Sequence, residues 1–133
     1  MSAWTKTNLG RVEDSAPPHG FEELLEARFA NEALGLELTG LSHQYVKPGM
    51  RLPFGHTHSV QEEVYVVLCG SGNLRVEDEL VELGGRLDAV RVGPGVWRGL
   101  EAGPDGLELL AFGAPVTAER DAEMDPGWWP AES

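Results

Sequence analysis

The chain has 133 residues, with 10 Lys and Arg against 22 Asp and Glu, which gives a formal net charge of -12. This length fits one domain, 1–133, that can bury a core without disulfides, and the single cysteine excludes an intrachain disulfide. A surface this acidic repels phosphate backbones and anionic lipid heads, so we expect neither nucleic-acid nor membrane binding. No signal-peptide pattern and no apolar run of about 20 residues occurs, which favours a cytoplasmic protein.

The first third of the chain is expected to be an arm followed by one helix and one strand. Trp4 to Pro18 contains a weak extended piece, and Pro17-Pro18-His19-Gly20 is typical of a turn. Phe21 to Ala30 is the best helix candidate, because apolar residues fall near helical spacing and glutamates favour its first turns. The end of that segment would equally suit the start of a strand. From Leu36 to Val46 apolar residues recur between polar ones, which predicts a strand.

Turn-forming glycines and prolines divide the rest of the chain into short apolar runs. Val64 to Cys69 is predicted to be a strand buried on both faces, and Gly70-Ser71-Gly72 to be a turn. Further strands are expected at 73–77, 80–83, 89–92, 97–101 and 107–112, the last two separated by Gly103-Pro104-Asp105-Gly106. About eight short strands at regular spacing predict an all-β sandwich or barrel, in which a closed barrel would hold a central cavity.

Two histidines and a carboxylate lie close together in the middle of the sequence. His56 and His58 are two residues apart, so on an extended backbone both imidazoles face the same side. Glu62 or Glu63 opens the next apolar run, which can return a carboxylate to that point. Two neutral imidazoles and one carboxylate with open positions form a known ligand set for a divalent metal, often non-haem iron, and zinc also accepts it.

The spacing of these residues resembles the first motif of the cupin superfamily. That motif has Gly, a short spacer, His-x-His, three or four residues, Glu, six residues and Gly. Here four residues separate His58 from Glu63, and six more lead to Gly70. The spacer that runs from Gly49 to the histidines is one residue longer than usual. The resemblance therefore selects Glu63 rather than Glu62 as the third ligand beside His56 and His58.

The second cupin motif, Gly, five residues, Pro-x-Gly, two residues and His, is matched only in part by 87–98. Gly95 fits the family glycine, whereas Leu87 replaces the first glycine and Arg98 stands where the last metal-binding histidine is expected. The resemblance implies a double-stranded β-helix, or jelly-roll, cupin barrel with little helix. It implies a core barrel of about 36–113, a short N-terminal arm of 1–35 and an acidic C-terminal tail of 114–133.

Arg98 leaves the chemistry of this cavity open. An arginine cannot ligate a metal, but it could form a bidentate ion pair with Glu63 and supply the missing positive charge. It could also receive an anionic ligand beside a three-ligand metal, or point outward. Tyr65 and His43 are further candidates for the cavity wall, with core packing and a structural histidine as their alternatives.

Trp128-Trp129 in the tail predicts either closure of the barrel end or a dimer interface, where tryptophan is enriched. The resemblance favours the second interpretation, so a homodimer is expected.

These observations predict a small cupin barrel that binds a divalent metal, a small ligand, neutral or anionic, or both. The metal would be Fe, Zn, Ni or Mn, and the protein would then resemble the metal-dependent cupin enzymes, such as dioxygenases or isomerases. The alternative is a metal-free cupin that binds or senses a small ligand, in which Arg98 replaces the fourth metal ligand. The catalytic residues, the substrate and the reaction are not predicted by the sequence.

Overall fold

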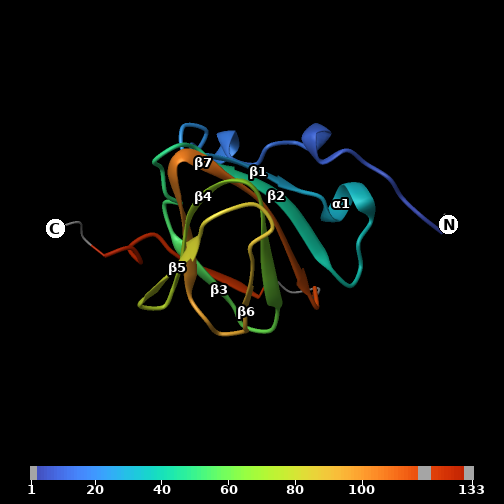
Figure 1. Ribbon diagram of the computed structural model, residues 1–133. Helices are drawn as coiled ribbons and strands as arrows, with labels where there is room; N and C mark the ends of the chain where they lie inside the picture. The colour runs from blue at the N-terminus through green and yellow to red at the C-terminus, as the bar shows by residue number, and fades with distance from the viewer. Residues whose placement is uncertain (1–2, 117–120, 131–133) are drawn as a thin grey trace.

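The computed structural model describes residues 3–116 and 121–130, and its strands form one curled antiparallel sheet (Figure 1). The order of paired strands is β1-β2-β7-β3-β8, and β4 pairs with β5, β6 and β7. The strand bounds are β1 Leu25–Phe29, β2 Gly40–Val46, β3 Gly55–His58, β4 Glu62–Val76, β5 Glu79–Leu83, β6 Ala89–Val92, β7 Arg98–Ala114 and β8 Ala122–Asp125. The expected all-β jelly-roll barrel is confirmed.

Helical structure is confined to short pieces of the described chain. The predicted helix over Phe21 to Ala30 is wrong, because Leu25 and Ala27 alternate with more exposed neighbours and form β1 against β2. The α-helix of this region is α1, Asn31–Leu34, and two 3₁₀ turns, Leu9–Arg11 and Pro17–His19, lie in the arm. The amphipathic period of this segment is therefore two rather than 3.6. Figure 1 shows the arm running along the β1 side of the barrel.

The two longest strands, β4 and β7, pass through two of the positions where the sequence predicted turns. Neither Gly70-Ser71-Gly72 nor 103–106 ends a strand, and the β4–β7 register jumps between Gly70, opposite Leu107, and Gly72, opposite Ala102. A Cβ on Gly70 would lie 2.0 Å from the carbonyl oxygen of Gly106. Glycine is needed here because the two backbones approach closely where the strands bend together.

The hydrophobic core fills one part of the barrel, where inward-facing residues of β4, β5 and β7 meet. Leu74, Leu83, Leu100, Leu107 and Leu109 are at most 2% exposed. Alternation along β4 places Glu63 and Tyr65 on the same inner face as this core. The polar site described below therefore lies directly against the apolar core.

The described residues 121–130 of the C-terminal segment pack against the barrel. Its strand β8 pairs with β3, and the Trp129 indole nitrogen donates a hydrogen bond of 2.8 Å to the Leu52 carbonyl. The Trp128 ring covers Gly55 and Gly99, where an added Cβ would come within 2.2 and 2.8 Å of it. Both tryptophans thus pack against the chain's own barrel, as the first interpretation of the pair required. The expected homodimer stays a prediction.

No helix among the described residues has the length and apolar character needed to cross a membrane.

Candidate functional site

Strand β3 places His56 and His58 on one face. Both imidazoles point into the barrel, while Thr57 between them is buried on the other side. The rings stand edge-to-face with centroids 5.2 Å apart. In the β3–β7 ladder His56 lies opposite Arg98, and residues paired across antiparallel strands share a face. This pairing brings the Arg98 side chain to the same site.

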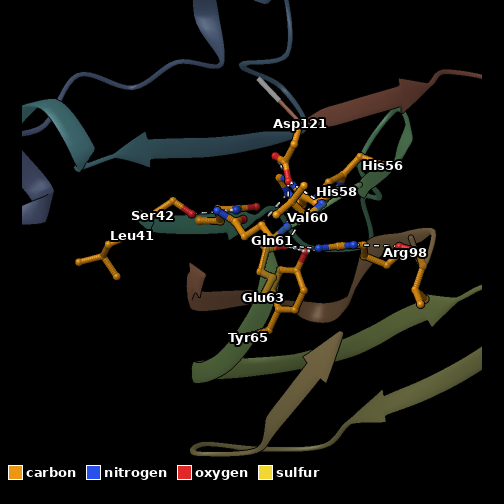
Figure 2. A network of polar contacts seen from close by, with 12 residues as sticks. Leu41, Ser42, His56, His58, Val60, Gln61, Glu63, Tyr65, Arg98 and Asp121 are labelled. Atoms are coloured by element: carbon orange, nitrogen blue, oxygen red, sulfur yellow. Dashed lines mark hydrogen bonds and ion pairs between the residues drawn. The ribbon is translucent and has the colours of Figure 1, made fainter. Parts of the chain in front are cut away.

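Glu63, at the start of β4, completes the cluster. A loop of three residues joins β3 to β4 and returns the chain so that the carboxylate faces both rings (Figure 2). The Glu63 Oε1 atom is 3.6 Å from His56 Nε2, and its Oε2 atom is 3.9 Å from His58 Nε2. One nitrogen of each histidine and one Glu63 oxygen lie within 4.8 Å of one another. Glu62 faces outward and pairs instead with Arg91 at 3.2 Å.

Arg98 is fully buried behind Glu63 and forms an ion pair with it. Its Nη2 donates to Glu63 Oε1 at 3.0 Å, and its Nη1 donates to the Val96 carbonyl at 2.8 Å. The Tyr65 hydroxyl donates to the same Glu63 oxygen and lies 3.4 Å from Arg98 Nε. The ion pair has one guanidinium nitrogen on one carboxylate oxygen, so it is not bidentate. It leaves Oε2 of Glu63 facing His58.

Burial and the neighbouring polar groups set the charges of Glu63, His56 and Tyr65. Burial opposes ionisation of Glu63, but its contacts with His56, Tyr65 and Arg98 outweigh burial and hold its pKa at about 2. Burial lowers the pKa of His56 and, with the Glu63 charge, raises the pKa of the Tyr65 hydroxyl. Glu63 is therefore an anion at neutral pH beside a neutral His56 and a neutral Tyr65.

Asp121, which precedes β8, holds His58 from the other side. Its Oδ1 atom accepts a hydrogen bond of 2.9 Å from His58 Nδ1, and its Oδ2 atom accepts from the backbone N–H groups of Val60 and Gln61 (Figure 2). Burial opposes ionisation of Asp121, but these bonds outweigh it and hold the pKa of the carboxyl at about 2. The sequence prediction missed Asp121, because it lies 63 positions after His58 in a tail rich in acidic residues.

The other predicted ligand-binding residues take different places in the structure. His43 pairs with Glu108 at 2.6 Å, as the structural-histidine alternative expects, and the cavity lining does not include it. A ligand-binding role for His43 stays a prediction. Tyr65 is 1% exposed and lies beneath Glu63. Arg98 is 0% exposed, so its guanidinium meets Glu63 and Tyr65 rather than a ligand in the cavity.

A cavity of about 580 Å³ opens beside His56, His58 and Glu63. The arm and β1 contribute much of its wall, including residues that the sequence prediction placed outside the barrel. Aromatic rings follow one another along it: Phe21 and Phe54 have centroids 6.1 Å apart, and Phe54 and His56 6.3 Å apart. Polar lining groups include Ser42, Gln44 and Gln61.

The donor set and its spacing fit a divalent metal ion. Ligand bonds of about 2.1 Å to a tetrahedral ion place two donor atoms about 3.4 Å apart. The histidine–glutamate separations of 3.6 and 3.9 Å would therefore shorten by about 0.5 Å or less on binding. A carboxylate can accept only, so Asp121 requires a proton on His58 Nδ1 and leaves the Nε2 lone pair toward Glu63. His56 Nδ1 is buried and has no hydrogen-bond partner among the described residues. His56 can therefore carry its proton on Nδ1 and keep the Nε2 lone pair for a ligand.

Comparison with solved structures identifies the barrel. A cupin protein from Bacteroides fragilis superposes with a TM-score of 0.71 at 21% sequence identity, covering 90% of this chain and 91% of its own. The chain has the cupin fold. The nucleoside dehydratase Pac13, from Streptomyces, gives a TM-score of 0.69 at 16% identity, with 90% of this chain and 89% of Pac13 covered. KdgF from Halomonas gives 0.65 at 12% identity, covering 89% of this chain and 97% of its own.

The chain shares the cupin fold with these proteins but little of their sequence. No family model matches the chain, and no curated protein matches it. The similar structures include Pac13 with uridine, so this cupin fold accommodates small organic ligands in at least one of them.

Proposed function

We propose that this cupin-fold protein binds a divalent metal ion through His56, His58 and Glu63 and takes a small organic ligand in the adjoining cavity. One observation carries the proposal: two imidazole nitrogens and a carboxylate oxygen converge within 4.8 Å on a cavity of about 580 Å³. Two nitrogens and one oxygen with open positions suit iron, zinc, nickel or manganese.

The Arg98–Glu63 ion pair is compatible with this proposal, because the two carboxylate oxygens have different partners. Arg98 and Tyr65 donate to Oε1, whereas Oε2 faces His58. The pair therefore orients the carboxylate and keeps it ionised, while one oxygen stays available. A bound divalent ion would supply Lewis-acid chemistry by polarising an oxygen of the ligand. A metal-dependent enzyme of the dioxygenase or isomerase kind remains our prediction for the activity.

The cavity wall favours a ligand with a flat, largely apolar body and polar groups at its edge. Phe21 and Phe54 both line the cavity, and aromatic rings stack favourably on planar groups. Gln44 and Gln61 offer amides that both donate and accept hydrogen bonds. The Arg98 guanidinium would not be available to an anionic group on the ligand, since it is buried in its own pairings. The uridine bound by Pac13 contains such a planar ring with polar groups at its edge, together with a polar ribose.

A second candidate function is a metal-free cupin that binds a small ligand. The observation that favours it is the buried Arg98, whose charge already balances Glu63 where the second cupin motif has a histidine. In that case His58, oriented by Asp121, would act on the ligand directly as a hydrogen-bond acceptor or base.

Metal stoichiometry distinguishes the two candidates. The untagged protein is stripped with a chelator, loaded separately with iron, zinc, nickel or manganese, desalted, and measured by elemental analysis. We expect about one ion per chain for at least one metal, lost in His58→Gln. The matched control is His43→Gln, which removes an imidazole outside the cavity and should leave the metal content unchanged. A wild-type protein that retains none of the four metals would refute the metal site and favour the second candidate.

A further inference from the structure

Asp121 connects the start of β8 to the His58 ring and to the loop between β3 and β4. Its carboxylate accepts from the His58 ring and from two consecutive backbone N–H groups, those of Val60 and Gln61. Its own carbonyl accepts from Ser59 N at 3.1 Å, and the next residue, Ala122, pairs with His58 in the β3–β8 ladder. The segment from Ser59 to Gln61 is the loop that carries the chain from the histidines to Glu63. Asp121 therefore contacts every residue of that loop.

We propose that Asp121 is the positioning residue of the site, fixing the tautomer and the orientation of His58; this rests on the proposed metal-binding function. An ionised carboxylate has no proton to donate, so His58 must carry its proton on Nδ1. The Nε2 atom then has its lone pair directed toward Glu63, 3.9 Å away. His56 has no equivalent support, because its Nδ1 lacks a partner among the described residues. The two histidines are thus unequal, and His58 is the preorganised one.

Fixing the His58 tautomer requires the charged, accept-only carboxylate of Asp121, and an uncharged side chain of the same size would not replace it. In Asp121→Asn one side-chain oxygen remains for three donors. The two backbone N–H groups are fixed by the loop, so the amide oxygen is expected to face them and the NH₂ group to face His58. His58 Nδ1 must then accept a hydrogen bond, which moves the ring proton to Nε2. The variant keeps the number of hydrogen bonds but removes the lone pair that a metal needs.

The experiment reads the tautomer first, without any metal. Long-range ¹⁵N–¹H correlation spectra of the chelator-treated protein are recorded at about pH 9, above the usual imidazole pKa of about 6.5. His58 is assigned by comparison with His58→Gln. We expect the Nδ1–H tautomer of His58 in the wild type and the Nε2–H tautomer in Asp121→Asn. Asp125→Asn is the matched control on the same segment, since its carboxylate accepts from Gly127 N and does not contact His58.

Metal affinity is measured second, by calorimetric titration with zinc. We expect Asp121→Asn to bind about 10- to 100-fold more weakly than the wild type, and Asp125→Asn to bind equally. An Nε2–H tautomer in the wild type, an unchanged tautomer in Asp121→Asn, or unchanged zinc affinity after a switched tautomer would each overturn the role of Asp121. If the wild type shows the Nδ1–H tautomer but binds no metal, the proposed function fails while the orienting contact stands. The wild-type spectrum remains decisive even if Asp121→Asn does not fold.

Discussion

Replacing Glu63 by glutamine should remove much of the acid sensitivity of this protein. The folded-state pKa of Glu63 is about 2, against 4.5 for an ordinary glutamate, and its side chain is 13% exposed. A lowered carboxyl pKa contributes stability that is fully present above the unfolded-state value and is lost as the pH falls toward the folded-state value. At 1.36 kcal/mol per pH unit, the shift corresponds to about 3 kcal/mol, of which about 2 kcal/mol is lost between pH 6 and pH 3.

Urea unfolding of the metal-free protein, followed by fluorescence at several pH values, measures this contribution. The quantity of interest is the difference in unfolding free energy between wild type and Glu63→Gln, because His56 and Asp121 also lower wild-type stability toward acid. This difference should shrink by about 2 kcal/mol from pH 6 to pH 3. The control is Glu62→Gln, an exposed carboxylate one position away. If the free energy of unfolding changes equally with pH in wild type and Glu63→Gln, the pKa of Glu63 is not lowered by its buried neighbours.

Two other substitutions test the packing around the site. Arg98→Met leaves the Glu63 charge without its buried partner and should lower the free energy of unfolding by about 3–5 kcal/mol at pH 7 in urea titrations; a loss below 1 kcal/mol would argue against a buried ion pair. Gly55→Ala places a methyl group 2.2 Å from the Trp128 ring and should cost about 1–3 kcal/mol, measured as a lower melting temperature. Gly85→Ala, which has open space around the new methyl, should leave that temperature nearly unchanged, and equal shifts in both variants would contradict the tryptophan packing.

Local spacing was enough to predict the centre of the site. Strand alternation puts His56 and His58 on one face, and a short connection returns Glu63, so the relevant contacts are between residues at most seven positions apart. The same alternation separates Glu62, which lies outside as predicted. The regular spacing of apolar runs between glycines and prolines predicted an all-β sandwich or barrel, and the resemblance to the cupin motif selected the jelly-roll barrel.

What the sequence could not give depends on pairing between distant segments. The register that sets Arg98 opposite His56, and the ladder that brings Asp121 to His58, join residues 42 and 63 positions apart and leave no local pattern. The helix prediction was wrong because the glutamates and the near-helical spacing of apolar residues favoured a helix, whereas the buried residues, Leu25 and Ala27, alternate as in a strand. The glycines at 70 and 72 were interpreted as a turn, because close approach of two backbones and a reversal of the chain require the same residue.

The most direct test of the account is the position of a bound metal in a crystal. Crystals are soaked with zinc or manganese, and diffraction is collected just above and below the absorption edge of that metal. We expect one strong anomalous peak per chain between His56 Nε2, His58 Nε2 and Glu63, with the Glu63 Oε1–Arg98 contact retained. A cavity without such a peak at saturating metal, or a peak bound only by surface carboxylates, would contradict the claim that these three residues form a metal site.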